Sequence, residues 1–132
     1  MSEVAENHEK DRQQFLELQQ KMVQETSKLK KLEQEQRRST VEKRKNELCL
    51  QELSLLPPQT NIYRTIGRTF VLVERGDMQR ELEQSVRDNE DFVNNSKDKK
   101  IYLEKQVKEA EENIRELLRG APALAKQIAG VA

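Results

Sequence analysis

The side chains that could perform catalysis are few and scattered. His8 stands alone in an acidic segment and Cys49 is the single cysteine, so neither has the partner that nucleophilic catalysis or thiolate metal binding requires. Carboxylates are abundant, but they fall on charged helical faces without the apolar burial that tunes a carboxylic acid for catalysis. Gly67 is isolated, and no Gly-Lys-Ser/Thr follows it as a phosphate-binding loop would need. We expect no enzymatic activity, no metal and no cofactor, with Cys49 as a small buried hydrophobic residue.

The spacing that carries most information lies in residues 60–73. Its β-branched and aromatic residues at short period predict two strands. Gly67 predicts a two-residue type II′ turn with Arg68, because glycine takes a positive φ at the first central position without strain. Ile66 then faces Thr69. The remaining pairs are Thr65 with Phe70, Arg64 with Val71, Tyr63 with Leu72 and Ile62 with Val73.

Both faces of this hairpin are largely apolar. A lone hairpin is marginal in water, and one with two apolar faces and two open edges needs other chains to complete it. Arg64 and Arg68 are candidates for contact with a partner's carboxylate, with simple solvent exposure as the alternative. One face carries Tyr63, Thr65, Phe70 and Leu72, and the other carries Ile62, Ile66, Val71 and Val73. The sequence therefore predicts an assembly element made of Ile62, Tyr63, Thr65, Ile66, Gly67, Phe70, Val71, Leu72 and Val73.

The composition does not suit a compact core. Of 132 residues 36% are charged, 34% are hydrophobic and 4% are aromatic, whereas globular domains have about 45–50% apolar residues. The 24 basic and 24 acidic residues cancel, which favours exposed helices over disorder and argues against a nucleic-acid partner. The N-terminus has no apolar core typical of a signal peptide, and no apolar run is long enough to span a membrane. We expect a cytoplasmic protein with no membrane partner.

Two heptad segments flank the hairpin. The first, about 11–55, has its seam at Phe15, Leu18, Met22, Glu25, Leu29, Leu32, Gln36, Ser39, Lys43, Asn46, Leu50 and Leu53. Val41, Leu48 and Leu55 lie off this seam, which leaves open a break or shift near 46–49 before Pro57 ends the helix. The second helix, about 78–119, has Asp77 as its predicted N-cap and Gly120 as its stop.

The two helices match when they are folded antiparallel about the hairpin. Asn46 then falls opposite Asn89, and Leu32 falls opposite Leu103, so polar meets polar and apolar meets apolar along the seam. The predicted fold is mostly α, a long antiparallel two-helix coiled coil joined by a β-hairpin of about 61–74. Residues 1–10 are expected to be a flexible N-terminus, 11–119 the folded domain, and 120–132 a C-terminal tail.

The core Tyr-x-x-Ile-Gly-Arg-x-Phe-Val-Leu (63–72) between two heptad helices resembles that of the β-type prefoldin subunits. The resemblance covers roughly residues 10–119 and extends to the segment 101–118 of the second helix. It implies a hetero-hexamer of α- and β-type subunits whose hairpins join into a β-barrel platform. It also implies an ATP-independent chaperone that holds unfolded actin and tubulin and passes them to the cytosolic chaperonin.

Client capture in such a protein is expected at the free ends of the helices, because an unfolded chain offers scattered apolar groups and no fixed shape. The alternative for these side chains is closure of the coiled-coil seam, and Leu118 beside the seam is the one expected to be exposed. Residues 120–132 either bind clients or partners or form a disordered tail with some helicity. A coiled-coil tether or adaptor without holdase activity remains the alternative function. The candidate tip residues are Phe15, Leu18, Ile114, Leu117 and Leu118.

Overall fold

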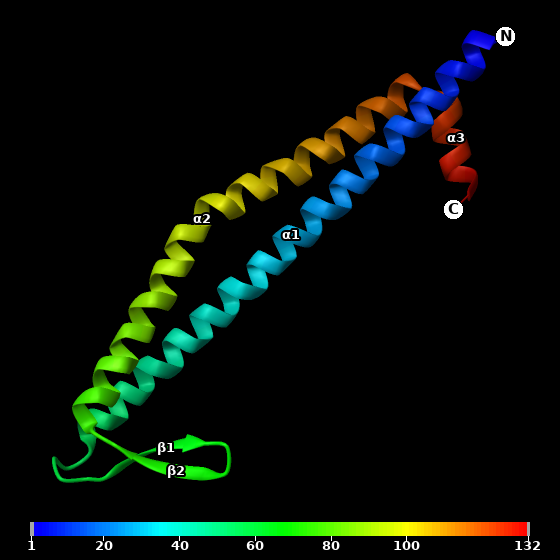
Figure 1. The fold of residues 1–132 in the computed structure, drawn as a ribbon. Coiled ribbons are helices and arrows are strands. Elements are labelled where there is room, and N and C mark those ends of the chain that lie inside the picture. Colours follow the sequence, from blue (N-terminus) through cyan, green and yellow to red (C-terminus); the bar gives the residue numbers. More distant parts are fainter. Residues whose placement is uncertain (1, 132) are drawn as a thin grey trace. The chain divides into compact units, whose positions relative to one another are not determined.

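The computed structural model describes residues 2–131, with the side chains of Ser2 and Val131 outside the described set. Within that range the chain forms three helices and one hairpin (Figure 1). The predicted mostly helical fold, with two long helices joined by a β-hairpin, is confirmed. The elements are α1 (Ser2–Leu55), β1 (Ile62–Ile66), β2 (Thr69–Val73), α2 (Arg75–Gly120) and α3 (Pro122–Val131).

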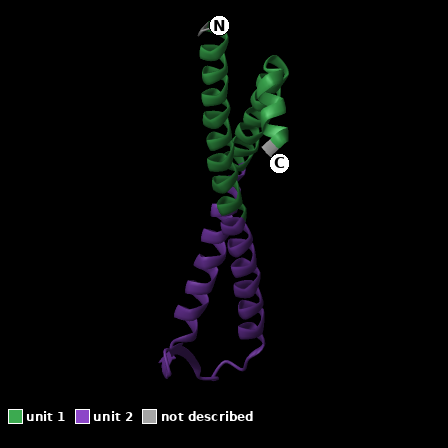
Figure 2. Ribbon diagram, turned by 90° about the vertical axis from the view of Figure 1, so that its right-hand side faces the viewer, with its two compact units in different colours: residues 1–33, 98–132 green, residues 34–97 purple. Residues whose placement is uncertain are grey.

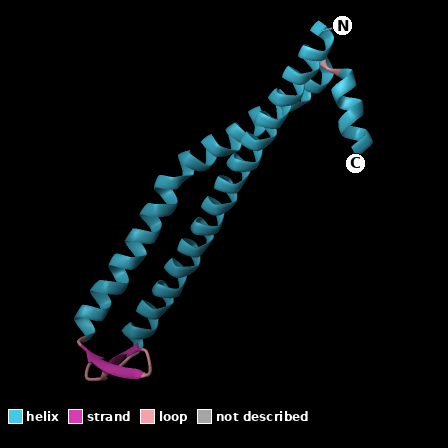
Figure 3. Ribbon diagram, turned by 45° about the vertical axis from the view of Figure 1, so that its right-hand side comes forward, coloured by secondary structure: helices cyan, strands magenta, loops and turns pink. Residues whose placement is uncertain are grey.

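The chain divides into two compact units (Figure 2). Residues 34–97 form the first, which we call the hairpin unit because it contains β1 and β2. Residues 1–33 and 98–132 form the second, which we call the terminal unit because it contains both ends of the chain. Figure 3 shows that helix makes up most of both units, with the two strands in the hairpin unit and loops confined to the hairpin connections and the junction of α2 with α3.

α1 begins earlier than the sequence predicts and does not break. It starts at Ser2 rather than near residue 11, and the acidic Glu3 in its first turn interacts favourably with the helix dipole. It continues through 46–49 to Leu55, because no glycine or proline interrupts the backbone hydrogen bonds before Pro57. All the predicted seam positions of α1 are buried or half-buried, and the off-seam Val41, Leu48 and Leu55 are exposed.

The seam of the hairpin unit contains polar side chains that form hydrogen bonds between α1 and α2. Asn46, only 6% exposed, donates from Nδ2 to Ser85 Oγ at 2.7 Å, and Asn89 donates to the same oxygen at 3.4 Å. Gln36 donates from Nε2 to Ser96 Oγ at 2.9 Å. The expected Asn46 and Asn89 pair therefore meets through Ser85, one helical turn away, because a seam side chain inserts between residues of the facing helix rather than facing one of them.

The hairpin has the predicted register. Ile66 pairs with Thr69 and the ladder runs outward to Ile62 with Val73. Gly67 has φ 59°, and no other described residue has a positive φ. A single positive φ at the first central position identifies a type II′ turn rather than type I′, which needs two.

Arg75 closes the end of α1. The last turn of α1 contains no basic residue to compensate its free carbonyl groups. The Arg75 guanidinium instead donates to the backbone carbonyls of Leu53, Leu56 and Pro57, the last at 3.0 Å. The first residue of α2 thereby caps the last turn of α1 across the hairpin.

The predicted N-cap at Asp77 is wrong. α2 begins at Arg75, and the amide of Met78 donates to the carbonyl of Glu74 at 3.0 Å, which makes Glu74 the capping position. The contacts of Arg75 with α1 explain the early start, because they hold that residue at the base of the hairpin. Asp77 lies inside the first turn, where its charge suits the helix dipole and pairs with Arg80.

We expect Arg75→Ala to lower the free energy of unfolding of the chain by about 1.5–3 kcal/mol, because several hydrogen bonds from a charged donor are lost together. Thermal unfolding followed by circular dichroism measures the change. Arg68→Ala is the matched control, since Arg68 lies exposed in the hairpin turn. Equal melting temperatures for both variants would show that the cap contributes nothing.

The terminal unit contains all but one of the buried apolar side chains of the described residues. Leu32 and Leu103, predicted to face each other, are both buried, as is Ala110. α3 adds a third helix to this unit, with Leu124 only 4% exposed and Ala121 also buried. Residues 122–131 are therefore a packed helix and not a disordered tail.

Candidate functional site

The exposed face of the hairpin is the most conspicuous apolar surface of the hairpin unit. Phe70 is 70% exposed, Leu72 60% and Tyr63 54%, and all three point to the same side of the sheet with Thr65. The sheet contains only β1 and β2, so both of its edges are open within the described residues. Large apolar groups beside unpaired backbone edges favour strand addition by another chain.

The other face of the hairpin is partly covered by its own chain. Ile62 and Val73, at the base, are half-buried, whereas Ile66 and Val71, nearer the turn, are exposed. Arg64 forms an ion pair with Glu81 of α2. Arg64 therefore contacts a carboxylate of its own chain rather than one of a partner. Arg68 is exposed.

The five predicted tip residues lie together in the terminal unit, but none is fully exposed. Phe15 and Leu18 of α1, and Ile114 and Leu117 of α2, are half-buried. Leu118, expected to be the exposed one, is half-buried as well. α3 belongs to the same unit, and its Leu124 and Ile128 line a hollow together with Phe15.

The exposed apolar groups of the terminal unit lie off the seam. They could have been found in the sequence as large apolar residues at positions where the heptad predicts charged or amide side chains. The heptad pattern does not predict them as site residues, because the seam accounts for the apolar residues near the helix ends. Within the two heptad segments they are Leu16 and Val23 of α1, and Ile101 and Tyr102 of α2; Val4, ahead of those segments, is exposed as well.

A hollow in the terminal unit separates α1 from α3. It has a volume of about 340 Å³ and lies between Phe15 and Leu16 on one side and Leu124 and Ile128 on the other. Arg12 and Gln127 complete its lining. Four of its six lining residues are apolar, which suits binding of an apolar side chain.

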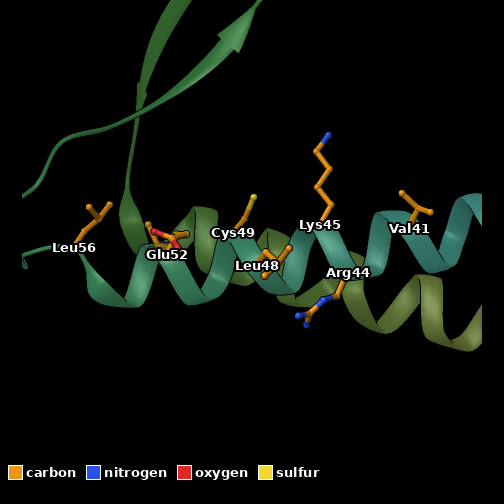
Figure 4. A pocket seen from close by; sticks show the side chains of 8 residues that line it. Val41, Arg44, Lys45, Leu48, Cys49, Glu52 and Leu56 are labelled. Carbon is orange, nitrogen blue, oxygen red and sulfur yellow. The ribbon is translucent and has the colours of Figure 1, made fainter.

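A groove of about 650 Å³ runs along the last turns of α1 in the hairpin unit (Figure 4). Cys49 is exposed there beside Leu48, so the prediction that it is buried is wrong: position 49 lies off the seam that buries Asn46 and Leu53. The groove offers apolar contact and no catalytic arrangement. Its lining residues are Val41, Arg44, Lys45, Leu48, Cys49, Glu52, Leu53 and Leu56.

Side chains that could bind a metal are dispersed along the helices. In the part of the chain that the structure describes, no three His, Cys, Asp or Glu side chains gather closely enough to hold a metal ion. Among residues 2–131, no helix combines the length and the apolar character that crossing a membrane requires.

Comparison with known proteins places these surfaces in a family context. A family model described as "Prefoldin subunit" matches residues 7–121. Prefoldin subunit 1 of Arabidopsis thaliana is 43% identical over 114 residues, which cover 86% of this chain and 89% of the relative. Prefoldin subunit 1 of Homo sapiens is 37% identical over 106 residues, covering 79% and 85%.

A solved structure shares the fold. The crystal structure of the prefoldin beta subunit from Thermococcus strain KS-1 superposes with a TM-score of 0.65 and covers 80% of this chain and 93% of that one. Its sequence is 21% identical, so the likeness concerns the fold alone.

Proposed function

The chain belongs to the prefoldin subunit family, and from this premise we propose that it is a β-type subunit of a hetero-hexameric, ATP-independent co-chaperone. In this proposal the hairpin joins the chain to other α- and β-type subunits, and the helix ends in the terminal unit hold unfolded proteins. The complex then passes clients such as actin and tubulin to the cytosolic chaperonin, and the chain works in the cytoplasm.

The observation that carries the proposal is the exposed hairpin face. Tyr63, Phe70 and Leu72 are each more than half exposed, and burial of such a side chain contributes about 1.5–3 kcal/mol. A chain that kept this face in water would present a template for aggregation. Pairing with the hairpins of other subunits removes both the exposed apolar area and the open edges.

The terminal unit supports client capture by its chemistry. Leu16 exposes apolar surface beside the half-buried Phe15, and Val23, Ile101 and Tyr102 expose apolar surface at other points of the unit. An unfolded protein has no fixed shape to recognise, so its binder needs adaptable apolar contacts rather than a shaped polar pocket. No nucleotide is needed for this kind of binding, which agrees with a holdase that works without ATP.

The test is an aggregation assay with the assembled complex. We expect a complex of this chain with its α- and β-type partner subunits to suppress aggregation of denatured actin without ATP. Adding the cytosolic chaperonin with ATP should then yield native actin, measured by DNase I binding. Aggregation at the rate seen without the complex would contradict the proposal.

A coiled-coil tether or adaptor is the second candidate function. Long helices with balanced charge suit it, but a tether has no use for the exposed hairpin face. Deletion of residues 62–73 would leave a tether's self-association intact, whereas the proposed function requires that this deletion abolish assembly with other subunits.

A further inference from the structure

We propose that α3 occupies the client-binding surface of its own chain, as a tethered stand-in for a short apolar segment of an unfolded protein. The binding site is the surface of α1 that faces α3 and includes Phe15 and Leu16, and client segments compete with α3 for it. This inference rests on the proposed function and deepens it by naming the class of segment that binds.

The seating of α3 shows what the surface accepts. Leu124 is 4% exposed and forms the anchor, and Ile128, one helical turn further on, is half-buried. Both line the hollow with Phe15 and Leu16 of α1. α3 thus presents two aliphatic side chains, spaced four residues apart on one face of the helix, to the hollow that Phe15 and Leu16 also line.

The sequence of α3 differs from that of the two long helices. PALAKQIAGV contains one charged residue, Lys126, which is exposed. α1 and α2, by contrast, carry a charged side chain at every few positions along their whole length. A segment of this kind, apolar and nearly uncharged with aliphatic residues at helical spacing, is what an unfolded globular protein exposes and a folded one buries.

The docking of α3 leaves room for exchange. The helix has 10 residues, and isolated helices shorter than about 12–15 residues are marginal in water. Its helical structure therefore depends on packing within the terminal unit, where Leu124 and Ala121 are buried. A hollow of about 340 Å³ remains beside it, and Leu16 is still 54% exposed, so α3 does not saturate the surface.

The junction between α2 and α3 allows α3 to leave while it stays tethered. α2 ends at Gly120 and α3 starts at Pro122, with only Ala121 between them. Glycine gives backbone freedom at that point, and proline starts the helix without losing a hydrogen bond. A tether this short keeps the effective concentration of α3 high. A client can bind only while α3 is undocked, so its apparent affinity equals the intrinsic affinity multiplied by the undocked fraction.

The test compares hexamers that contain the wild-type chain, Leu124→Asp, or a chain ending at Gly120. Ala123→Asp is the matched control, because it adds the same charge to an exposed position of the same helix. The probe is fluorescent, reduced and carboxymethylated α-lactalbumin, which stays unfolded. A photoreactive residue in place of Leu16 reports what occupies the surface, and native mass spectrometry verifies that each hexamer is assembled.

We expect Leu124→Asp and the truncation to bind the probe about five- to tenfold more tightly than the wild type, with Ala123→Asp unchanged. The crosslinker should react with α3 in the wild type and with the probe in the truncated chain. Equal or weaker binding after release of α3, while the wild-type hexamer binds the probe, overturns this inference alone. Absence of probe binding to all hexamers overturns the proposed function and this inference with it.

Discussion

Phe70→Asp is expected to abolish stable assembly of the chain with other prefoldin subunits while leaving its helices folded. Phe70 is 70% exposed in the single chain, so its replacement removes no internal packing. In the proposed assembly the same side chain is buried against a neighbouring subunit. The substitution removes about 1.5–3 kcal/mol of apolar burial there, and burying an unpaired carboxylate costs several kcal/mol in addition. The affinity should fall by a factor of about 100 or more.

Co-purification of tagged partner subunits measures this loss, and circular dichroism verifies that the variant keeps its helices. Val23→Asp is the matched control, because Val23 is also a largely exposed apolar residue but lies on α1 in the terminal unit. Leu72→Asp should behave as Phe70→Asp does, since both lie on the exposed face. Stoichiometric recovery of the hexamer with either hairpin variant would refute the assembly role of that face.

Truncation of both helix ends is expected to leave the hexamer assembled and to weaken client binding. Removing residues 1–17 and 115–132 deletes Phe15, Leu16, Leu117 and Leu118 together with α3, and keeps the whole hairpin unit. Each lost apolar anchor is worth about 1.5–3 kcal/mol when it is buried against a client, but the tips of the other subunits still contribute. We expect roughly tenfold more complex to be needed for equal suppression of actin aggregation.

The chain that ends at Gly120 is the control for this truncation. It lacks α3 but keeps the ends of α1 and α2, and it is expected to bind clients more tightly than the wild type rather than less. Opposite signs for the two truncations would separate capture by the tips from competition by α3. Unchanged holdase activity after the double truncation would place capture elsewhere in the chain.

Local rules in the sequence are sufficient to predict the hairpin. Gly67 has no side chain to oppose a positive φ, and from that one turn the whole register follows up to Ile62 with Val73. The seam of α1 can be predicted equally well, because apolar and other seam residues alternate at spacings of three and four from Phe15 to Leu53 and so form one buried stripe.

The features that could not be predicted depend on contacts between distant segments. Arg75 caps α1 only because the hairpin returns the chain to the end of that helix, and that contact moves the start of α2 ahead of Asp77. α3 is too short to be stable by propensity, so its helix depends on where Leu124 packs. Leu118 lies beside the seam position Leu117 and is half-buried, which the heptad pattern alone does not predict.

Native mass spectrometry of the complex that contains the wild-type chain, purified from its own cells, tests the assembly role of the hairpin. If the hairpin is an assembly element completed by other prefoldin subunits, the mass should equal that of a hexamer with this 15.5 kDa chain and distinct partner subunits. Recovery of the chain as a monomer, or only as a complex with copies of itself, would contradict the account.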